Sequence, residues 1–150
     1  MTSTFEDALA KAQSEMVAVA LEYIGGRADT IYLFALSAGG AKGFDVFYRI
    51  AGKVFQTHKV NDATVEGAPI DASVARQIAL QKFGLGQLEA LEGAAAASGR
   101  PMPTLIKAVF DVSRRSLASD IRYDDFYSAS NRSPDEFFQD WFAEESAKNA

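Results

Sequence analysis

The chain contains no cysteine and only one histidine among its 150 residues. Without thiols it has no disulfide, no thiolate metal site and no cysteine nucleophile. A single imidazole cannot build a histidine-rich metal centre, and we expect His58, within Gln56-Thr-His-Lys, on the surface of a strand. The lack of cysteine is compatible with a reducing compartment.

Long hydrophobic runs are also missing, because a charge or a glycine interrupts every apolar run within a few positions. No segment approaches the roughly 18 uncharged apolar residues that a membrane span needs. The N-terminal Met1-Thr-Ser-Thr-Phe-Glu-Asp has no basic segment of the kind that opens a signal peptide. We therefore expect a cytoplasmic protein that does not bind a membrane.

The net charge of −5 is unevenly distributed along the chain. Twelve acidic and twelve basic side chains cancel in residues 1–119, so the whole excess lies in residues 120–150. An acidic surface repels nucleic-acid phosphates and attracts basic proteins over a Debye length of roughly 8–10 Å. This pattern predicts a protein partner and no direct contact with nucleic acid, although solvation of a terminal helix explains the charge equally well.

The first half of the chain reads as a helix followed by three strands. Apolar residues recur every 3.6 positions over residues 5–23, and Gly25 and Gly26 follow as helix stops. Residues 30–36 are apolar on both faces, as in a central strand. A turn over 39–43 leads to a strand over 44–50, in which Phe44, Val46, Tyr48 and Ile50 share one side, and a third strand is expected over 54–60.

The second half predicts a helix, two strands and a last helix. Asp71 is expected to cap a helix over about 72–98, with a break or bend at Gly84 and Gly86. Strands follow over 104–111 and 117–123, and Ser133-Pro-Asp-Glu136 is a capping box that starts the last helix. The 150 residues are thus expected to form one α+β domain, a five-stranded antiparallel sheet packed with helices in the order α-β-β-β-α-β-β-α.

Catalytic and cofactor motifs are weak. Ser37-Ala-Gly-Gly-Ala-Lys-Gly lacks the spacing of a phosphate-binding loop and precedes a strand instead of a helix, so it reads as a hairpin turn. Arg114 and Arg115 are too few basic residues to indicate nucleic-acid binding. Asp120, Asp124 and Asp125 offer hard oxygen ligands without EF-hand spacing, so a metal-dependent hydrolase is the least favoured alternative. We expect no enzyme activity, cofactor or bound metal.

The acidic C-terminal part also carries a group of aromatic residues on the last expected helix: Phe137, Phe138, Trp141 and Phe142. At this spacing they cover more than one helical face, so some lie in the core and others are free to anchor a partner. Carboxylates beside exposed aromatics are typical of protein interfaces, where charge steers association. We therefore expect a partner-binding surface formed by Asp120, Asp124, Asp125, Asp140, Trp141, Glu144 and Glu145.

Several segments together resemble the YezG-like immunity protein family over nearly the full length: Ile31-Tyr-Leu-Phe-Ala, Val46-Phe-Tyr-Arg-Ile, Thr104-Leu-Ile-Lys-Ala-Val-Phe-Asp, Ile121-Arg-Tyr-Asp-Asp and Trp141. Members are small cytoplasmic bacterial antitoxins that bind and neutralise polymorphic toxins, often nucleases. The resemblance implies stoichiometric occlusion of a cognate toxin, and an acidic surface fits a basic nuclease domain.

The expected order of elements is also similar to that of class I type III secretion chaperones, which hold an effector segment on a homodimer. That similarity rests on architecture and charge alone. Both alternatives describe binding proteins, and both a monomer and a homodimer stay open.

Overall fold

A computed structural model describes residues 4–63 and 67–148. Its elements are, in chain order, α1 (Phe5–Ile24), β1 (Thr30–Ala38), β2 (Ala41–Ile50), β3 (Lys53–Gln56), the 3₁₀ helix η1 (Thr57–Asp62), α2 (Val74–Ser98), β4 (Leu105–Asp111), β5 (Ser116–Arg122) and α3 (Pro134–Ala147). The strands form one antiparallel sheet in the order β3-β2-β1-β4-β5. The predicted fold class and element order are confirmed, with η1 as an addition.

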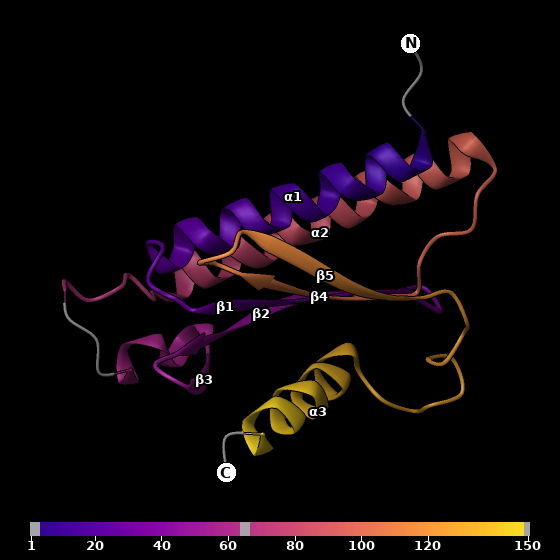
Figure 1. Cartoon of the computed structure of the whole chain (residues 1–150). Helices are drawn as coiled ribbons and strands as arrows, with labels where there is room; N and C mark the ends of the chain where they lie inside the picture. Colours follow the sequence, from indigo (N-terminus) through magenta and orange to yellow (C-terminus); the bar gives the residue numbers. More distant parts are fainter. Residues whose placement is uncertain (1–3, 64–66, 149–150) are drawn as a thin grey trace.

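Helices cover both faces of the sheet (Figure 1). The long helices α1 and α2 lie side by side on one face, and α3 lies on the other. Each face has its own hydrophobic core, one under α1 and α2 and a smaller one under α3. Among the described residues, no helix combines the length and the apolar character that crossing a membrane requires.

The central strands β1 and β2 supply both cores, as the two-sided apolar pattern predicts. In β1, Ile31 and Leu33 face α1 and α2, whereas Tyr32 and Phe34 belong to the α3 core. Successive side chains of a strand point to opposite faces, so one strand serves both layers. In β2, all four alternating residues lie in the larger core: Phe44, Val46, Tyr48 and Ile50. This confirms the prediction that they share one side of the strand.

Local capping signals position the outer helices. Thr4 and Asp7 form a capping box at the start of α1, and Gly25, at φ 62°, ends it in the left-handed conformation. Ser133 and Glu136 form the predicted capping box of α3, with Pro134 at its first turn. The glycine end of α1 and the capping box of α3 were predicted from the sequence, because the residues that form each of them lie close together in the chain.

The third strand is shorter than predicted. Pairing ends at Gln56, and the predicted strand over 54–60 turns into η1. Thr57 and Val60, one 3₁₀ turn apart, are both buried, and the hydroxyl of Tyr23 donates to the carbonyl of Thr57 at 3.0 Å. The expectation that His58 lies on a strand is therefore wrong, since it is an exposed residue of η1.

Of the break or bend predicted at Gly84 and Gly86, the break is wrong, because α2 is continuous from Val74 to Ser98. The helix ends at Gly99 as expected. A Cβ atom at Gly84 would lie 2.1 Å from the ring of Phe44, so this glycine allows α2 to approach β2 closely. Ser73, not Asp71, is the N-cap, and Asp71 accepts a hydrogen bond from the amide of Ser73. The turn predicted over 39–43 is limited to Gly39 and Gly40, at φ 58° and 78°.

Candidate functional site

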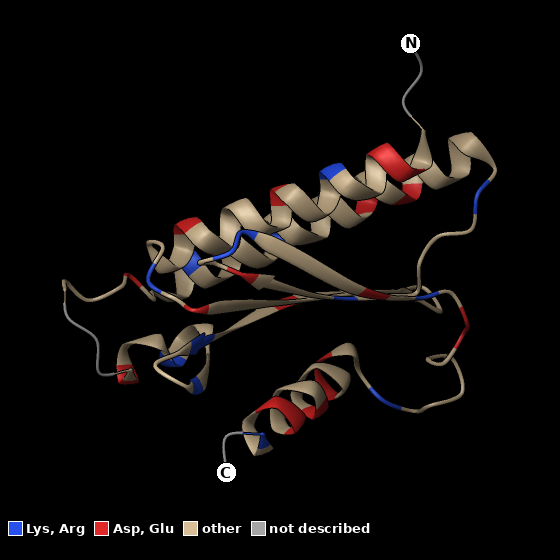
Figure 2. Ribbon diagram, viewed as in Figure 1, with Lys and Arg blue, Asp and Glu red and all other residues tan. Residues whose placement is uncertain are grey.

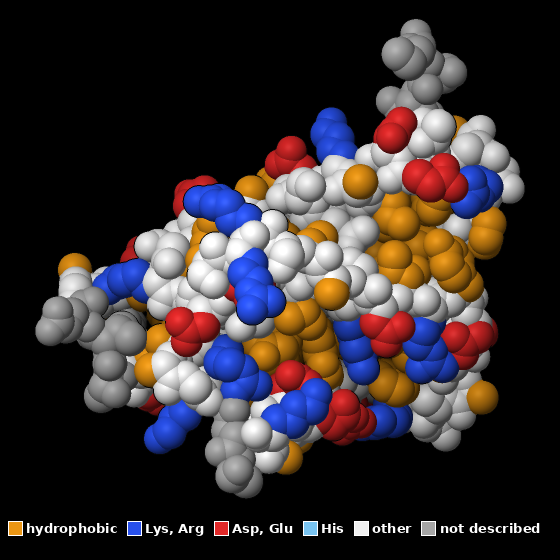
Figure 3. All heavy atoms as spheres, viewed as in Figure 1, with side chains coloured by type: hydrophobic (Ala, Val, Ile, Leu, Met, Phe, Trp, Pro, Cys, Tyr) orange, Lys and Arg blue, Asp and Glu red, His pale blue; other side chains and the backbone are white. Residues whose placement is uncertain are grey.

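The short helix α3 leaves part of its face of the sheet open. It packs on β2 and β3, and a groove of about 390 Å³ lies between α3 and the β4–β5 hairpin. We call this the α3 groove; it is lined by Lys107, Val109, Ala118, Ser119, Asp120, Trp141, Glu144, Glu145 and Lys148. Figure 3 shows hydrophobic side chains at the surface between β5 and α3, with charged side chains around them.

The wall of the α3 groove includes Trp141, which is anchored in the smaller core. Its indole is 6% exposed and makes edge contacts with the rings of Tyr32 and Phe47, at centroid distances of 5.7 and 5.1 Å. The Nζ atom of Lys107 lies 5.5 Å from the Trp141 ring centroid. Trp141 is therefore a core residue that borders the groove, and it does not protrude as an anchor.

Carboxylates from two separate elements meet at the α3 groove, and acidic positions recur along α3 in Figure 2. Asp120 is exposed on β5, directly opposite Lys107 in the β4–β5 register, and Glu144 is exposed on α3. Neither has an ion pair with any residue that the structure describes. Glu145 differs, because its side chain is 12% exposed and lies 2.6 Å from Lys148 and 3.8 Å from Arg49.

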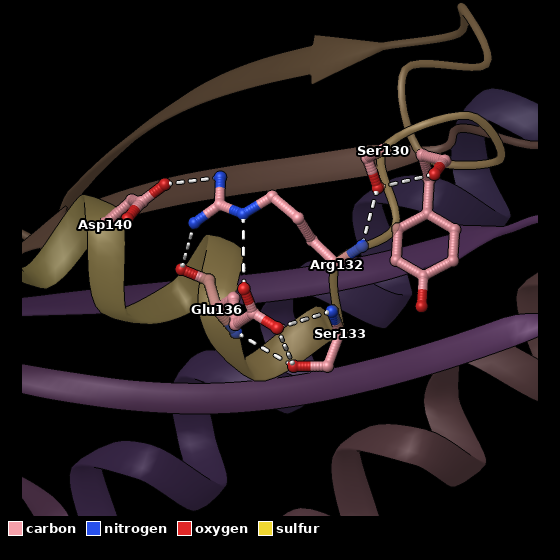
Figure 4. Close-up of polar contacts among 6 residues, drawn as sticks. Ser130, Arg132, Ser133, Glu136 and Asp140 are labelled. Carbon is pink, nitrogen blue, oxygen red and sulfur yellow. Dashed lines mark hydrogen bonds and ion pairs between the residues drawn. The ribbon is translucent and has the colours of Figure 1, made fainter.

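Asp140 lies in the middle of α3, outside the α3 groove, and forms an ion pair with Arg132, which precedes the helix (Figure 4). The guanidinium of Arg132 lies 2.7 Å from Asp140 and 3.4 Å from Glu136, and it stacks over Phe137. The hydrogen bond from Arg132 holds the pKa of Asp140 below its usual range. The carboxylate of Glu136 also accepts a hydrogen bond from the Ser133 amide, so this network fixes the N-terminal turn of α3.

Asp124 and Asp125 likewise form local hydrogen bonds, in the segment between β5 and α3. Asp124 accepts two hydrogen bonds from the guanidinium of Arg122, at 2.6 and 3.0 Å, and this bidentate pair lowers the pKa of Asp124. Asp125 accepts a hydrogen bond from the amide of Ser128 at 3.0 Å, and its pKa is lowered by hydrogen bonding to the side chain and then to the amide of Ser128. Four of the seven predicted partner-binding residues thus line the α3 groove, whereas Asp124, Asp125 and Asp140 make local contacts outside it.

The sheet residues Lys107, Val109 and Ala118 were missed by sequence reasoning. Lys107 is half-buried in the middle of β4, and the register that places it opposite Asp120 is set by the hairpin turn. Lys107 could have been found from the sequence by deriving the register of the predicted β4–β5 hairpin, which places it opposite Asp120.

The other chemical candidates do not converge on the α3 groove. Within residues 4–63 and 67–148, no three side chains among His, Cys, Asp and Glu are grouped so as to hold a metal ion. Arg114 and Arg115 lie in the turn between β4 and β5, and His58 is remote in η1.

No protein-family model and no curated protein matches the sequence. The resemblance to immunity proteins therefore stays a prediction, and the geometry of the α3 groove carries the functional argument.

Proposed function

We propose that this chain is a binding protein whose partner docks on the α3 groove, and that it acts as an immunity protein against a basic toxin. One observation supports this most: Asp120 of β5 and Glu144 of α3 border the same groove, and neither forms an ion pair with a described residue. Unpaired carboxylates around an apolar floor suit a partner that brings basic side chains with apolar stems.

The mechanism is occlusion. Basic residues of the toxin are steered to the acidic rim, and the edge of Trp141 with Val109 and Ala118 excludes water from the contact. A nuclease toxin needs basic residues to hold phosphates, so a carboxylate surface that pairs with them blocks its substrate site. The protein is then needed in stoichiometric amounts.

Co-expression with the product of the immediately upstream gene tests this proposal. We expect the chain to restore growth and to co-purify with that product. Asp120→Lys combined with Glu144→Lys should weaken binding at least about tenfold, because two attractions become repulsions. Asp62→Lys is the matched control, since Asp62 is exposed on η1, away from the α3 groove. A non-toxic upstream product, or equal binding by the double variant, would contradict the proposal.

A second candidate is a chaperone that holds an effector segment. The observed element order, α-β-β-β-α-β-β-α, supports it, since it is the order on which the similarity to class I secretion chaperones rests. That function requires a homodimer. Light scattering on the purified chain tests this candidate, because a monomer at micromolar concentration is incompatible with the chaperone.

A further inference from the structure

The edge of the sheet at β2 is only partly paired. β3 pairs with residues 47–50 of β2 and then gives way to η1. In the described part of the chain, no strand pairs with the outer edge of residues 41–46. An unpaired strand edge presents amide and carbonyl groups that can bind another strand.

A groove follows this free edge. It measures about 310 Å³ and lies between α2, which contributes Gln81 and Leu85, and the start of α3, which contributes Pro134 and Asp135. Phe34 and Phe138 supply apolar surface at its base. We call it the β2 groove. It shares no lining residue with the α3 groove.

One amide of the free edge is satisfied by a side chain. The Val46 amide donates to Oδ1 of the neighbouring Asp45 at 2.9 Å, in the place of the carbonyl of a further strand. An incoming strand can supply that carbonyl and release the Asp45 carboxylate for another partner.

The charge of the β2 groove is uncompensated. Asp45 is half-buried, and burial raises its pKa, with the charge of Asp135 as a smaller cause. Neither carboxylate forms an ion pair with a described residue. Lys42 lines the same groove, but its ammonium is held by Glu92 at 3.0 Å and Glu89 at 3.8 Å. Two carboxylates in a partly apolar groove favour a cationic occupant.

We propose that an extended segment of a partner protein adds as a strand to residues 41–46 of β2 and places a lysine or arginine between Asp45 and Asp135. The apolar walls accommodate the aliphatic stem of that residue, and the two carboxylates bind its charged end. This second site does not depend on the α3 groove or on the immunity function.

Fluorescence anisotropy with a labelled synthetic peptide tests the proposal. The probe is a short peptide of alternating threonine and valine with a central arginine. We expect saturable binding, which Asp45→Asn and Asp135→Asn each weaken about tenfold. Asp120→Asn in the α3 groove is the matched control and should leave the affinity unchanged. Hydrogen exchange should slow at the outward-facing amides of Lys42, Phe44 and Val46 when the peptide binds.

Two modified peptides separate strand addition from simple charge attraction. A central glutamate should abolish binding, and methylation of alternate backbone nitrogens should abolish it while the charge is retained. Equal binding of the methylated peptide, no effect of Asp45→Asn, or no binding at all would overturn the proposal; in the last case Asp45 only guards the edge against aggregation. Protection of these amides in a dimer without peptide would assign the edge to a second copy of this chain and overturn it too.

Discussion

At the scale of single residues, Asp45 couples the stability of the protein to pH. Burial, with the charge of Asp135 as a smaller cause, raises the pKa of its carboxyl from 3.8 to about 6. Between these values the folded chain keeps a proton that the unfolded chain has released, so stability falls as pH rises through this window. Asp45→Asn keeps an oxygen acceptor for the Val46 amide and removes the charge.

We therefore expect Asp45→Asn to raise the free energy of unfolding at pH 7 by roughly 1–3 kcal/mol. Near pH 3 the effect should vanish, because the carboxyl is protonated in both states. Urea denaturation followed by the fluorescence of Trp141, the single tryptophan, measures both values. Asp62→Asn, at an exposed position, should change neither. If Asp45→Asn raised the free energy of unfolding equally at both pH values, the pKa argument would be refuted. If the variant were more stable at pH 7 but lost peptide binding, Asp45 would be a residue kept for function at a cost in stability.

The environment of Asp45 was not predictable from the sequence. Between Phe44 and Val46, both buried, it reads as an ordinary outward-facing position of a strand. Its pKa depends first on burial, then on the neighbouring Val46 amide, on Asp135 of α3 and on Gln81 of α2. Only the tertiary fold brings these groups together.

At the scale of elements, two glycines of α2 should respond oppositely to alanine. Gly84→Ala places a methyl group against the ring of Phe44, so we expect a loss of about 1–3 kcal/mol. Gly86 is exposed, and a Cβ atom there would meet open space, so Gly86→Ala should gain about 0.5–1 kcal/mol from helix propensity. Thermal or urea unfolding of the two variants checks this. A stabilising Gly84→Ala would mean that Phe44 moves aside at little cost.

These glycines also explain why local signals predicted some elements and not others. Helix α1 and the start of α3 follow from periodicity and capping, which are contained in neighbouring residues. The two glycines suggested a break in α2, but packing on the sheet holds the helix together across them. The turn from β3 into η1 depends on Tyr23, which lies in α1, far away in the sequence.

At the scale of the whole molecule, counting charges along the sequence located the acidic region but did not show which of its carboxylates lie together in the fold. It treated Asp124, Asp125 and Asp140 as equivalent to Asp120 and Glu144. The structure separates them, because Arg122, Arg132 and the Ser128 amide engage the first three locally. Which carboxylates stay available depends on the sheet register and on where α3 lies.

The shared central strands make a further prediction for the whole molecule. Because β1 and β2 supply both cores, loss of either core removes packing from the strands that support the other. We expect α3 and the α1–α2 layer to unfold together, so that Trp141 fluorescence and far-ultraviolet circular dichroism give the same midpoint. Phe138, which is 1% exposed in the smaller core, allows a direct test.

Phe138→Ala should cost about 3–5 kcal/mol and lower both midpoints equally, although Phe138 belongs to the α3 layer alone. Met16→Ala, in the core under α1 and α2, is the reciprocal variant, and it should shift Trp141 fluorescence as much as circular dichroism. If Phe138→Ala moved the fluorescence transition and left the dichroism transition in place, α3 would be a separately unfolding layer. The α3 groove would then have a movable wall, and partner binding would include the cost of ordering it.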